Sequence, residues 1–177
     1  MEIKNRELHR VAVSAIIIKP PEEGVEGPED FRYLICRRSE KKKAFPGLWT
    51  VPGGGMEVDD YIDTPRPYGN SDCWYFAVTE TLKREVREEV NIEIGRLVYL
   101  LDITFIRPDG IPAIILSFYC NYLSGEVRLN EENTDYKWAT FEEAKQYKFC
   151  PGLLGEIEMV DKIMKGEDPA KVEYRNI

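Results

Sequence analysis

The sequence predicts an α/β fold, in which several β-strands and two long helices form one domain over residues 1–177. Runs of apolar and β-branched residues that end at Pro or Gly are typical of buried strands, and residues 10–19 form the clearest run. Apolar residues at steps of three and four are typical of helices that bury one face, and they recur in residues 74–90 and 151–165. A chain of this length can bury a sizeable core.

The expected strands follow one another along the chain with clear turn signals between them. Further strands are predicted at residues 33–36, 94–106 and 112–122, with short strands before the glycines at 53–55 and after residue 132. The first two strands are expected to pair antiparallel. The strands at 94–106 and 112–122 are expected to form a hairpin, because Arg107-Pro108-Asp109-Gly110 is a favourable turn sequence. Residues 124–126 predict a second turn.

Capping signals and loop composition complete the pattern. Ser71 or Asp72 is expected to cap the first long helix, and Thr140 and Glu143 have the spacing of a capping box for a short helix. Gly166 is expected to end the second long helix. Three polar segments rich in Gly, Pro or charged residues are expected to lie outside helices and strands. Residues 19–31 would form a surface loop, residues 59–73 a loop before the first helix, and residues 167–177 a partly disordered tail.

The composition excludes several classes of protein. The net charge of −8 argues against general nucleic-acid binding, which needs a basic surface. No membrane association is expected, because the longest apolar run, residues 11–18, is too short to span a bilayer. The N-terminus lacks the layout of a signal peptide, so a cytoplasmic protein is expected. The four cysteines are scattered without a CxxC pair, which suits reduced thiols better than a disulfide frame or a zinc site.

Three glutamates on the first long helix are the main candidates for chemistry. Glu85, Glu88 and Glu89 share one helical face, and Glu89 falls at the edge of the apolar stripe. Carboxylates gathered beside a core are costly unless a positive charge neutralises them, and a hard divalent cation with oxygen ligands would do so. From the helix alone, a solvated acidic face remains the alternative.

Two segments before this helix could support a site. The glycines at 53–55 follow a short apolar strand, and they would let the backbone bend tightly and approach a ligand. Residues 37–43 form the only basic cluster of the chain, with Arg37, Arg38 and three lysines. This cluster is either a solvated loop or a group that holds substrate phosphate.

The glycines and the glutamate helix together resemble the Nudix box, G-x5-E-x7-R-E-U-x-E-E-x-G-U, where U is apolar. The matching positions are Gly54, Arg84, Glu85, Val86, Glu88, Glu89 and Ile92. The flanking residues 47–54 also look like this family, and residues 132–138 resemble its Glu-x-x-Glu-Tyr-Arg-Trp segment. These pieces lie in family order over roughly residues 10–147.

The sequence departs from the box in three ways. The first glutamate of the box falls on Asp60, a shorter carboxylate, and Asp59 or Asp63 could also take its place. The interval from there to Arg84 holds 23 residues instead of 7, so the loop at 59–73 contains an insertion of about 16 residues. Asparagine replaces the last glycine of the box at position 91, which is mild because Asn also forms left-handed C-caps.

The resemblance implies an α/β/α sandwich with a mixed β-sheet and a loop–helix–loop catalytic motif. It also implies an enzyme, a pyrophosphohydrolase that cleaves a phosphoric anhydride bond in a nucleoside diphosphate linked to another group. The implied cofactor is Mg²⁺, or Mn²⁺ in its place, and the implied partner is a small nucleotide. Members of the family are often dimers, so a homodimer is left open.

The resemblance also implies a role for each candidate residue. Glu88 and Glu89 would be the principal metal ligands, helped by a backbone carbonyl near Gly53 and Gly54. Glu85 would be a further ligand or would orient the attacking water. Arg84 would support the helix acids and the loop, and Glu132 would be a metal ligand or the general base. Arg38 and Glu57 would contact the substrate. Asp60 would pair with Arg84.

Several alternatives remain open from the sequence. A non-catalytic nucleotide-sensing module is one, although it would not need to keep all three glutamates. The isomerase branch of the family would need a cysteine at the site, and Cys36 and Cys73 lack the expected setting. A structural domain without enzymatic activity is the third alternative. The substrate could be a nucleoside triphosphate, a dinucleotide polyphosphate, a nucleotide sugar or ADP-ribose, at which the position of Pro108 hints.

Overall fold

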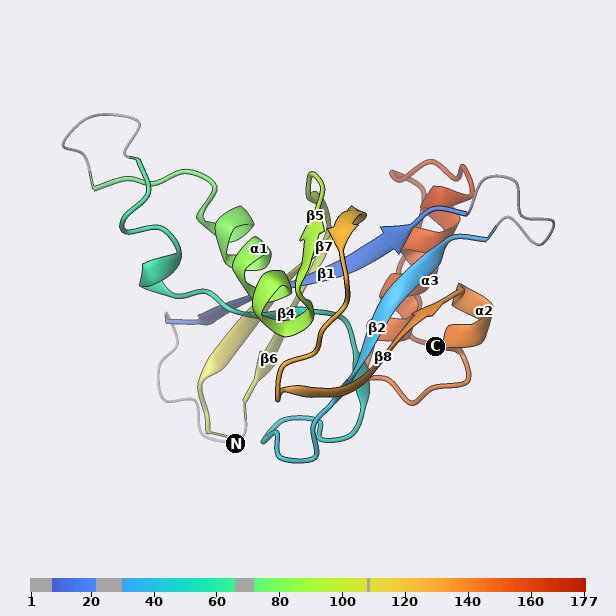
Figure 1. Cartoon of the computed structure of the whole chain (residues 1–177), viewed down its shortest axis with the longest axis horizontal. Coiled ribbons are helices and arrows are strands. Elements are labelled where there is room, and N and C mark those ends of the chain that lie inside the picture. The colour runs from blue at the N-terminus through green and yellow to red at the C-terminus, as the bar shows by residue number, and fades with distance from the viewer. Residues whose placement is uncertain (1–7, 22–29, 66–71, 108) are drawn as a thin grey trace.

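An eight-stranded mixed sheet forms the centre of the computed structural model, which describes residues 8–21, 30–65, 72–107 and 109–177 (Figure 1). The strands are β1 Arg10–Lys19, β2 Arg32–Arg38, β3 Trp49–Thr50, β4 Gly53–Gly55, β5 Ile92–Ile94, β6 Val98–Ile106, β7 Pro112–Gly125 and β8 Asn133–Ala139. The helices are the 3-10 helix η1 Val58–Asp60 and the α-helices α1 Ala77–Val90, α2 Phe141–Ala144 and α3 Leu153–Met164.

Strand β1 organises the sheet. It pairs in parallel with β7 along its length, with Ser14 opposite Ser117. On its other side it pairs antiparallel with β2 at one end and with β4 at the other. Strand β8 pairs with β2, whereas β5 and β6 both pair with β7. The antiparallel pairing of the first two predicted strands and the predicted β6–β7 hairpin are therefore confirmed.

Helices cover both faces of the sheet, which gives the predicted α/β/α sandwich (Figure 1). Side chains alternate along a strand, so Val13 and Ala15 of β1 pack on the α1 side while Ile16 and Ile18 pack on the α3 side. The first core includes the predicted apolar stripe of α1, whose Leu82, Val86 and Val90 are fully buried. The second core includes Ile157 and Val160 of α3.

Several predicted strand boundaries were wrong. The segment at 94–106 is not one strand, because it contains the end of β5 and all of β6, with a break at residues 95–97. Gly95 in this break still donates its N–H to the Asn121 carbonyl of β7 at 2.8 Å. The predicted turn at 124–126 does not form, since β7 continues through Gly125 and no turn is assigned to residues 126–130. The glycines at 53–55 form no tight turn, because they pair with β1 as strand β4.

The ends of the first long helix also differ from the prediction. Helix α1 begins at Ala77, and its N-cap is Phe76 in a left-handed conformation (φ 64°) without a side-chain cap. Asp72 is therefore not the cap, and Ser71 lies outside the described residues. At the other end the prediction for Asn91 is confirmed, because it forms a left-handed C-cap (φ 57°) whose N–H donates to the Arg87 carbonyl at 3.0 Å.

The C-terminal part of the chain agrees with the sequence in outline. The capping box of α2 forms as predicted, with the Thr140 side chain accepting from the Glu143 N–H. Helix α3 starts at Leu153, two residues later than predicted, after Gly152 in a left-handed conformation. The tail at 167–177 has no helix or strand, but the Tyr174 hydroxyl donates to the Gly152 carbonyl at 3.3 Å.

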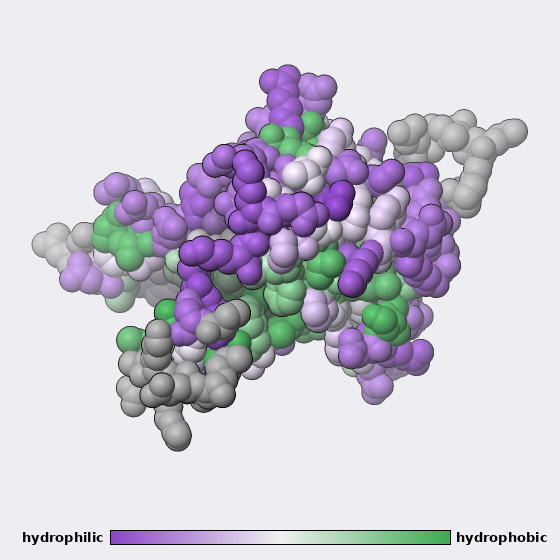
Figure 2. Space-filling view, turned by 90° about the horizontal axis from the view of Figure 1, so that it is seen from below, coloured by the Kyte–Doolittle hydropathy of each residue, from purple (hydrophilic) through white to green (hydrophobic). Residues whose placement is uncertain are grey.

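Three predictions fall wholly or partly outside the description. They concern residues 22–29 of the surface loop, residues 66–71 of the loop before α1, and Pro108. Among the described helices, none is both long and apolar enough to cross a membrane. Seen from below, the surface is mostly hydrophilic, with hydrophobic patches near the middle of the face (Figure 2).

Candidate active site

Strand β4 and helix α1 form one continuous wall of the candidate site. The Gly53 N–H donates to the Glu89 carboxylate at 3.0 Å, which ties the strand to the helix. Glycine is required at this position, since φ is 154° and a Cβ atom would collide with the Val13 carbonyl. A Cβ atom on Gly54 would instead meet the carboxylate of Glu85, so this glycine makes room for that side chain.

Glu89 is the most buried of the three helix glutamates, with 5% of its surface exposed. Burial raises the pKa of its carboxyl to about 8, the Gly53 N–H opposes that change, and the nearby Glu85 and Glu132 carboxylates add to it. Burial also raises the pKa of Glu85, against the influence of Arg84. The buried thiol of Cys36 has a raised pKa for the same reason, with a further contribution from Glu89. The buried acids of the site therefore favour their neutral forms unless a positive charge offsets their burial.

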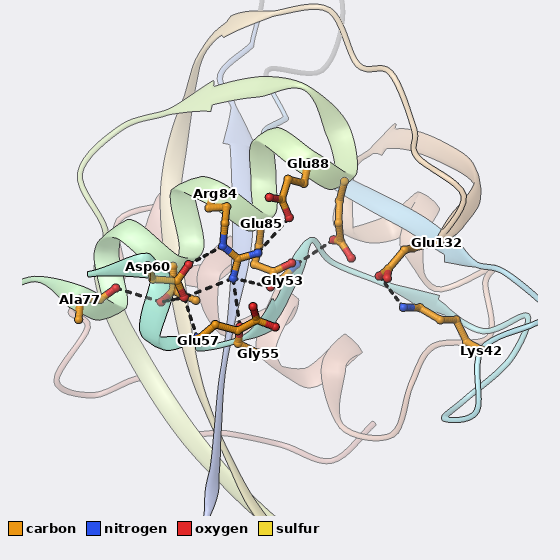
Figure 3. A network of polar contacts seen from close by, with 12 residues as sticks. Lys42, Gly53, Gly55, Glu57, Asp60, Ala77, Arg84, Glu85, Glu88 and Glu132 are labelled. Atoms are coloured by element: carbon orange, nitrogen blue, oxygen red, sulfur yellow. Dashed lines mark hydrogen bonds and ion pairs between the residues drawn. The ribbon is translucent and has the colours of Figure 1, made fainter. Parts of the chain in front are cut away.

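Arg84 lies among the acids and links the helix to the preceding loop (Figure 3). Its guanidinium contacts Glu85 at 3.0 Å and Glu88 at 2.9 Å. It also donates to the Asp60 carboxylate and, at 3.2 Å, to the Gly55 carbonyl. The predicted pairing of Asp60 with Arg84 is thus confirmed. A bridge to four partners fixes the orientation of the helix face.

Helix η1 brings Asp60 to this position. Its carboxylate accepts from the Thr81 hydroxyl at 2.7 Å and from the Glu57 N–H at 2.8 Å. Burial raises the pKa of Asp60, but the hydrogen bonds from Arg84, Glu57 and Thr81 outweigh burial and lower it to about 2. Asp59 is exposed and makes no such contacts among the described residues. The start of the predicted loop at 59–73 is therefore an ordered helical turn.

Glu132 closes the site from the opposite side. It precedes β8, and its carboxylate lies 2.5 Å from the ammonium of Lys42 (Figure 3). Lys42 lowers the pKa of Glu132, and the carboxyl groups of Glu132 and Glu89 are in hydrogen-bonding contact. The structure thus brings Glu132 to the helix glutamates from a segment more than forty residues away.

The two predicted substrate contacts lie at the edges of this site. Arg38, at the end of β2, donates from Nε to the Ala44 carbonyl at 3.0 Å, and its charge acts on Glu132. Glu57 is exposed and lines a groove of about 520 Å³ between η1 and α1. The other residues that line it are Asp59, Asp60, Glu80, Arg84, Arg87 and Glu88.

The donor atoms of this site fit a hard divalent cation by their chemistry. Carboxylate oxygens of Glu85, Glu88, Glu89 and Glu132 are the ligands that Mg²⁺ and Mn²⁺ prefer. Within the described ranges, no three such side chains already surround one point. Arg84 holds Glu85 and Glu88 instead, and Lys42 holds Glu132. A cation bound by the helix glutamates would therefore compete with Arg84 for the oxygens of Glu85 and Glu88.

Two supporting residues were missed in the sequence. Thr81 donates a hydrogen bond to the Asp60 carboxylate. Its position one helical turn before Arg84 was the sequence signal that could have indicated this contact. Lys42 was visible only as one member of the basic cluster, and nothing in the sequence distinguished it from Lys41 or Lys43. Its pairing with Glu132 depends on contacts between distant segments.

Comparisons with known proteins agree with this geometry. Residues 67–155, half of the chain, match the NUDIX domain, and this match contains α1 and Glu132. The nucleoside triphosphatase NudI of Escherichia coli K12 is 32% identical over 128 residues, covering 67% of this chain and 79% of that protein. This chain belongs to the Nudix hydrolase family.

The fold of solved Nudix proteins is similar as well. A MutT Nudix hydrolase from Burkholderia pseudomallei superimposes with a TM-score of 0.61 and 21% identity, covering 86% of this chain and 98% of that one. The Nudix domain of Shewanella oneidensis NrtR, solved with ADP ribose, superimposes with a TM-score of 0.65 and 15% identity, covering 90% of this chain and 90% of that one. The protein is accordingly a Nudix pyrophosphohydrolase acting on phosphoric anhydride bonds, and enzymes of this family generally need a divalent metal ion.

Proposed function

We propose that this Nudix hydrolase uses Mg²⁺, or Mn²⁺ in its place, to hydrolyse a nucleoside triphosphate to a nucleoside monophosphate and pyrophosphate. The observation that carries this proposal is the convergence of Glu85, Glu89 and Glu132 beside the glycine strand β4, with too little positive charge to neutralise them. The relationship to the nucleoside triphosphatase NudI supports the choice of substrate. ADP-ribose is the second candidate, supported by the ligand of the NrtR domain.

In this proposal the acids divide into ligands and a proton acceptor. Glu88 and Glu89 are the principal ligands of the cation, Glu85 is a further ligand, and a backbone carbonyl of Gly53 or Gly54 completes the set. When bound, the cation neutralises charge on the phosphate oxygens and orients the diphosphate. Glu132 accepts the proton of the attacking water, whose oxygen bonds to phosphorus while the bridging oxygen leaves with the pyrophosphate.

The remaining residues hold these groups and the substrate. Arg84 keeps Glu85, Glu88 and the β4 backbone in one arrangement, and Asp60 anchors it. Arg38 contacts the substrate phosphates near Glu132, and Glu57 contacts the substrate from the groove beside α1. The proposal treats residues 1–177 as one hydrolase domain that acts in the cytoplasm on small nucleotides, without general nucleic-acid binding. A homodimer is compatible with it.

A substrate panel with product identification tests this function. Nucleoside triphosphates, ADP-ribose, a nucleotide sugar and a dinucleotide polyphosphate would be incubated with Mg²⁺ or Mn²⁺, and the products separated by ion-exchange chromatography. Release of pyrophosphate from a triphosphate at the highest kcat/KM is expected. Two monophosphates released from ADP-ribose at a higher kcat/KM would replace the first candidate with the second. Binding without any product over hours would refute both.

A further inference from the structure

One lysine of the basic cluster is fixed differently from its neighbours. The Lys42 ammonium lies 2.5 Å from the Glu132 carboxylate, and only 29% of the lysine side chain is exposed. Lys41 and Lys43 on either side are exposed. These three lysines carry the same charge within one short loop, and Figure 3 shows the Lys42 side chain turned toward Glu132.

The same loop also holds the backbone around Glu132. The Ser39 N–H donates to the Glu132 carbonyl at 2.8 Å, and the Lys42 N–H donates to the Ser39 carbonyl at 3.1 Å. The Glu132 N–H donates to the Asn130 side chain at 2.9 Å. The Asn130 N–H donates in turn to the carbonyl of Glu89 at 3.2 Å. Glu132 is therefore held by the lysine loop on one side and by the end of α1 on the other.

We propose that Lys42 is a positioning residue, which holds the Glu132 carboxylate beside Glu89 during hydrolysis. Glu132 lies on an irregular segment before β8, so its own backbone fixes the side chain less firmly than a helix would. The ion pair with Lys42 restricts the orientation of the carboxylate beside Glu89. An ion pair that is this exposed adds little to the stability of the fold, so its value lies in geometry.

This inference rests on the proposed role of Glu132 in the reaction. Small displacements of a catalytic group are costly, and a shift of about 1 Å can lower a rate by about 10²-fold. Loss of the lysine is therefore expected to act on the chemical step rather than on substrate affinity. A lysine that bound substrate phosphate directly would show the opposite pattern, because its loss would raise KM.

The test compares Lys42→Met with Lys43→Met, which removes the same charge from the adjacent exposed position. Lys42→Met is expected to lower kcat at least about 10-fold with KM changed less than about 3-fold. Lys42→Arg is expected to recover most of kcat, since a guanidinium can hold the carboxylate. The double variant Lys42→Met, Glu132→Gln is expected to be no slower than Glu132→Gln alone.

Amide hydrogen exchange of the metal-free protein gives a second measurement that does not depend on activity. Exchange at the Ser39 amide is expected to become several-fold faster in Lys42→Met and to stay unchanged in Lys43→Met. The proposal is overturned if Lys42→Met keeps a normal kcat, if the change falls on KM, if Lys43→Met loses as much activity, or if Ser39 exchange is unaffected. A normal rate for Glu132→Gln would instead refute the proposed role of Glu132 and would leave the Lys42–Glu132 contact untouched.

Discussion

The guanidinium of Arg84 contacts the carboxylate of Asp60, which precedes it by 24 residues. The Nudix box normally places a glutamate only eight residues before this arginine. Helix η1 holds Asp60 against the side of α1, so the shorter side chain reaches the arginine despite the intervening insertion. The Asp60 side chain is completely buried, whereas the neighbouring Asp59 is exposed. This ion pair therefore joins the part of the box that contains β4 and η1 to the part that lies on α1.

Replacement of Asp60 by Asn should disrupt the site while the same change at Asp59 should not. The substitution leaves Arg84 without its buried counter-ion, which should cost about 2 kcal/mol of unfolding free energy and about 10-fold in kcat. Urea denaturation and steady-state kinetics would measure both effects. Equal losses in Asp60→Asn and Asp59→Asn would contradict the assignment.

Replacement of Glu89 by Gln should nearly abolish hydrolysis and preserve the fold. Loss of one ligand should lower kcat by about 10²-fold or more. Without metal the variant should be at least as stable as the wild type near pH 7, because a neutral amide does not have to take up a proton to be buried. Added Mg²⁺ should raise the melting temperature of the wild type but hardly that of the variant. Glu93→Gln, which changes an exposed glutamate paired with Arg87, is the matched control. A near-normal kcat in Glu89→Gln would rule out its role as a principal ligand.

Two of the three glycines of β4, Gly53 and Gly54, should respond differently to replacement by alanine. At Gly53 the added methyl group meets the backbone of β1 in a strained conformation, so Gly53→Ala should destabilise the fold by about 1–3 kcal/mol. At Gly54 it meets the end of the flexible Glu85 side chain. Gly54→Ala should therefore displace that carboxylate and lower kcat with little change in stability. The reverse order of effects in thermal melts and kinetics would show that the two positions have been assigned incorrectly.

A buried carboxyl on the far face of the sheet should make stability depend on pH. Glu156 of α3 is 2% exposed, and burial raises its pKa to about 7 against a hydrogen bond with Ser117. The folded state keeps this proton up to a higher pH than the unfolded state, so the contribution of Glu156 to stability is greatest below pH 4.5 and is lost as pH rises through 7. Glu156→Gln should remove this loss, on the order of 2 kcal/mol, in urea titrations across that range. Glu167→Gln in the exposed tail should leave the pH profile unchanged.

The elements that rest on local patterns could be predicted from the sequence. The apolar stripe of α1 follows from side-chain periodicity, and the buried strand β1 follows from its continuous apolar run. The burial of Glu89 at the edge of the α1 stripe follows from helical geometry. The Thr140–Glu143 capping box also depends only on neighbouring residues. Such features depend on interactions between residues that are close together in the sequence.

The features that were missed depend on contacts between distant segments. Nothing near positions 53–55 indicates that these glycines pair with β1, since the partner strand lies forty residues earlier. Helix α1 begins at Ala77, after Phe76, and not directly after Asp72, where a conventional capping residue stands, so local capping preference did not decide the boundary. The Lys42–Glu132 pair joins two loops that meet only in the folded protein.

The attachment of β4 to β1 has a consequence for how this enzyme can change over evolution. Strand β4 is fixed by its ladder with β1, and α1 is fixed by packing on the same sheet. The two elements that carry the candidate site are therefore placed independently of the chain that joins them, provided that Asp60 reaches Arg84. A change in the number of residues between Asp60 and Ala77 therefore need not displace either β4 or α1.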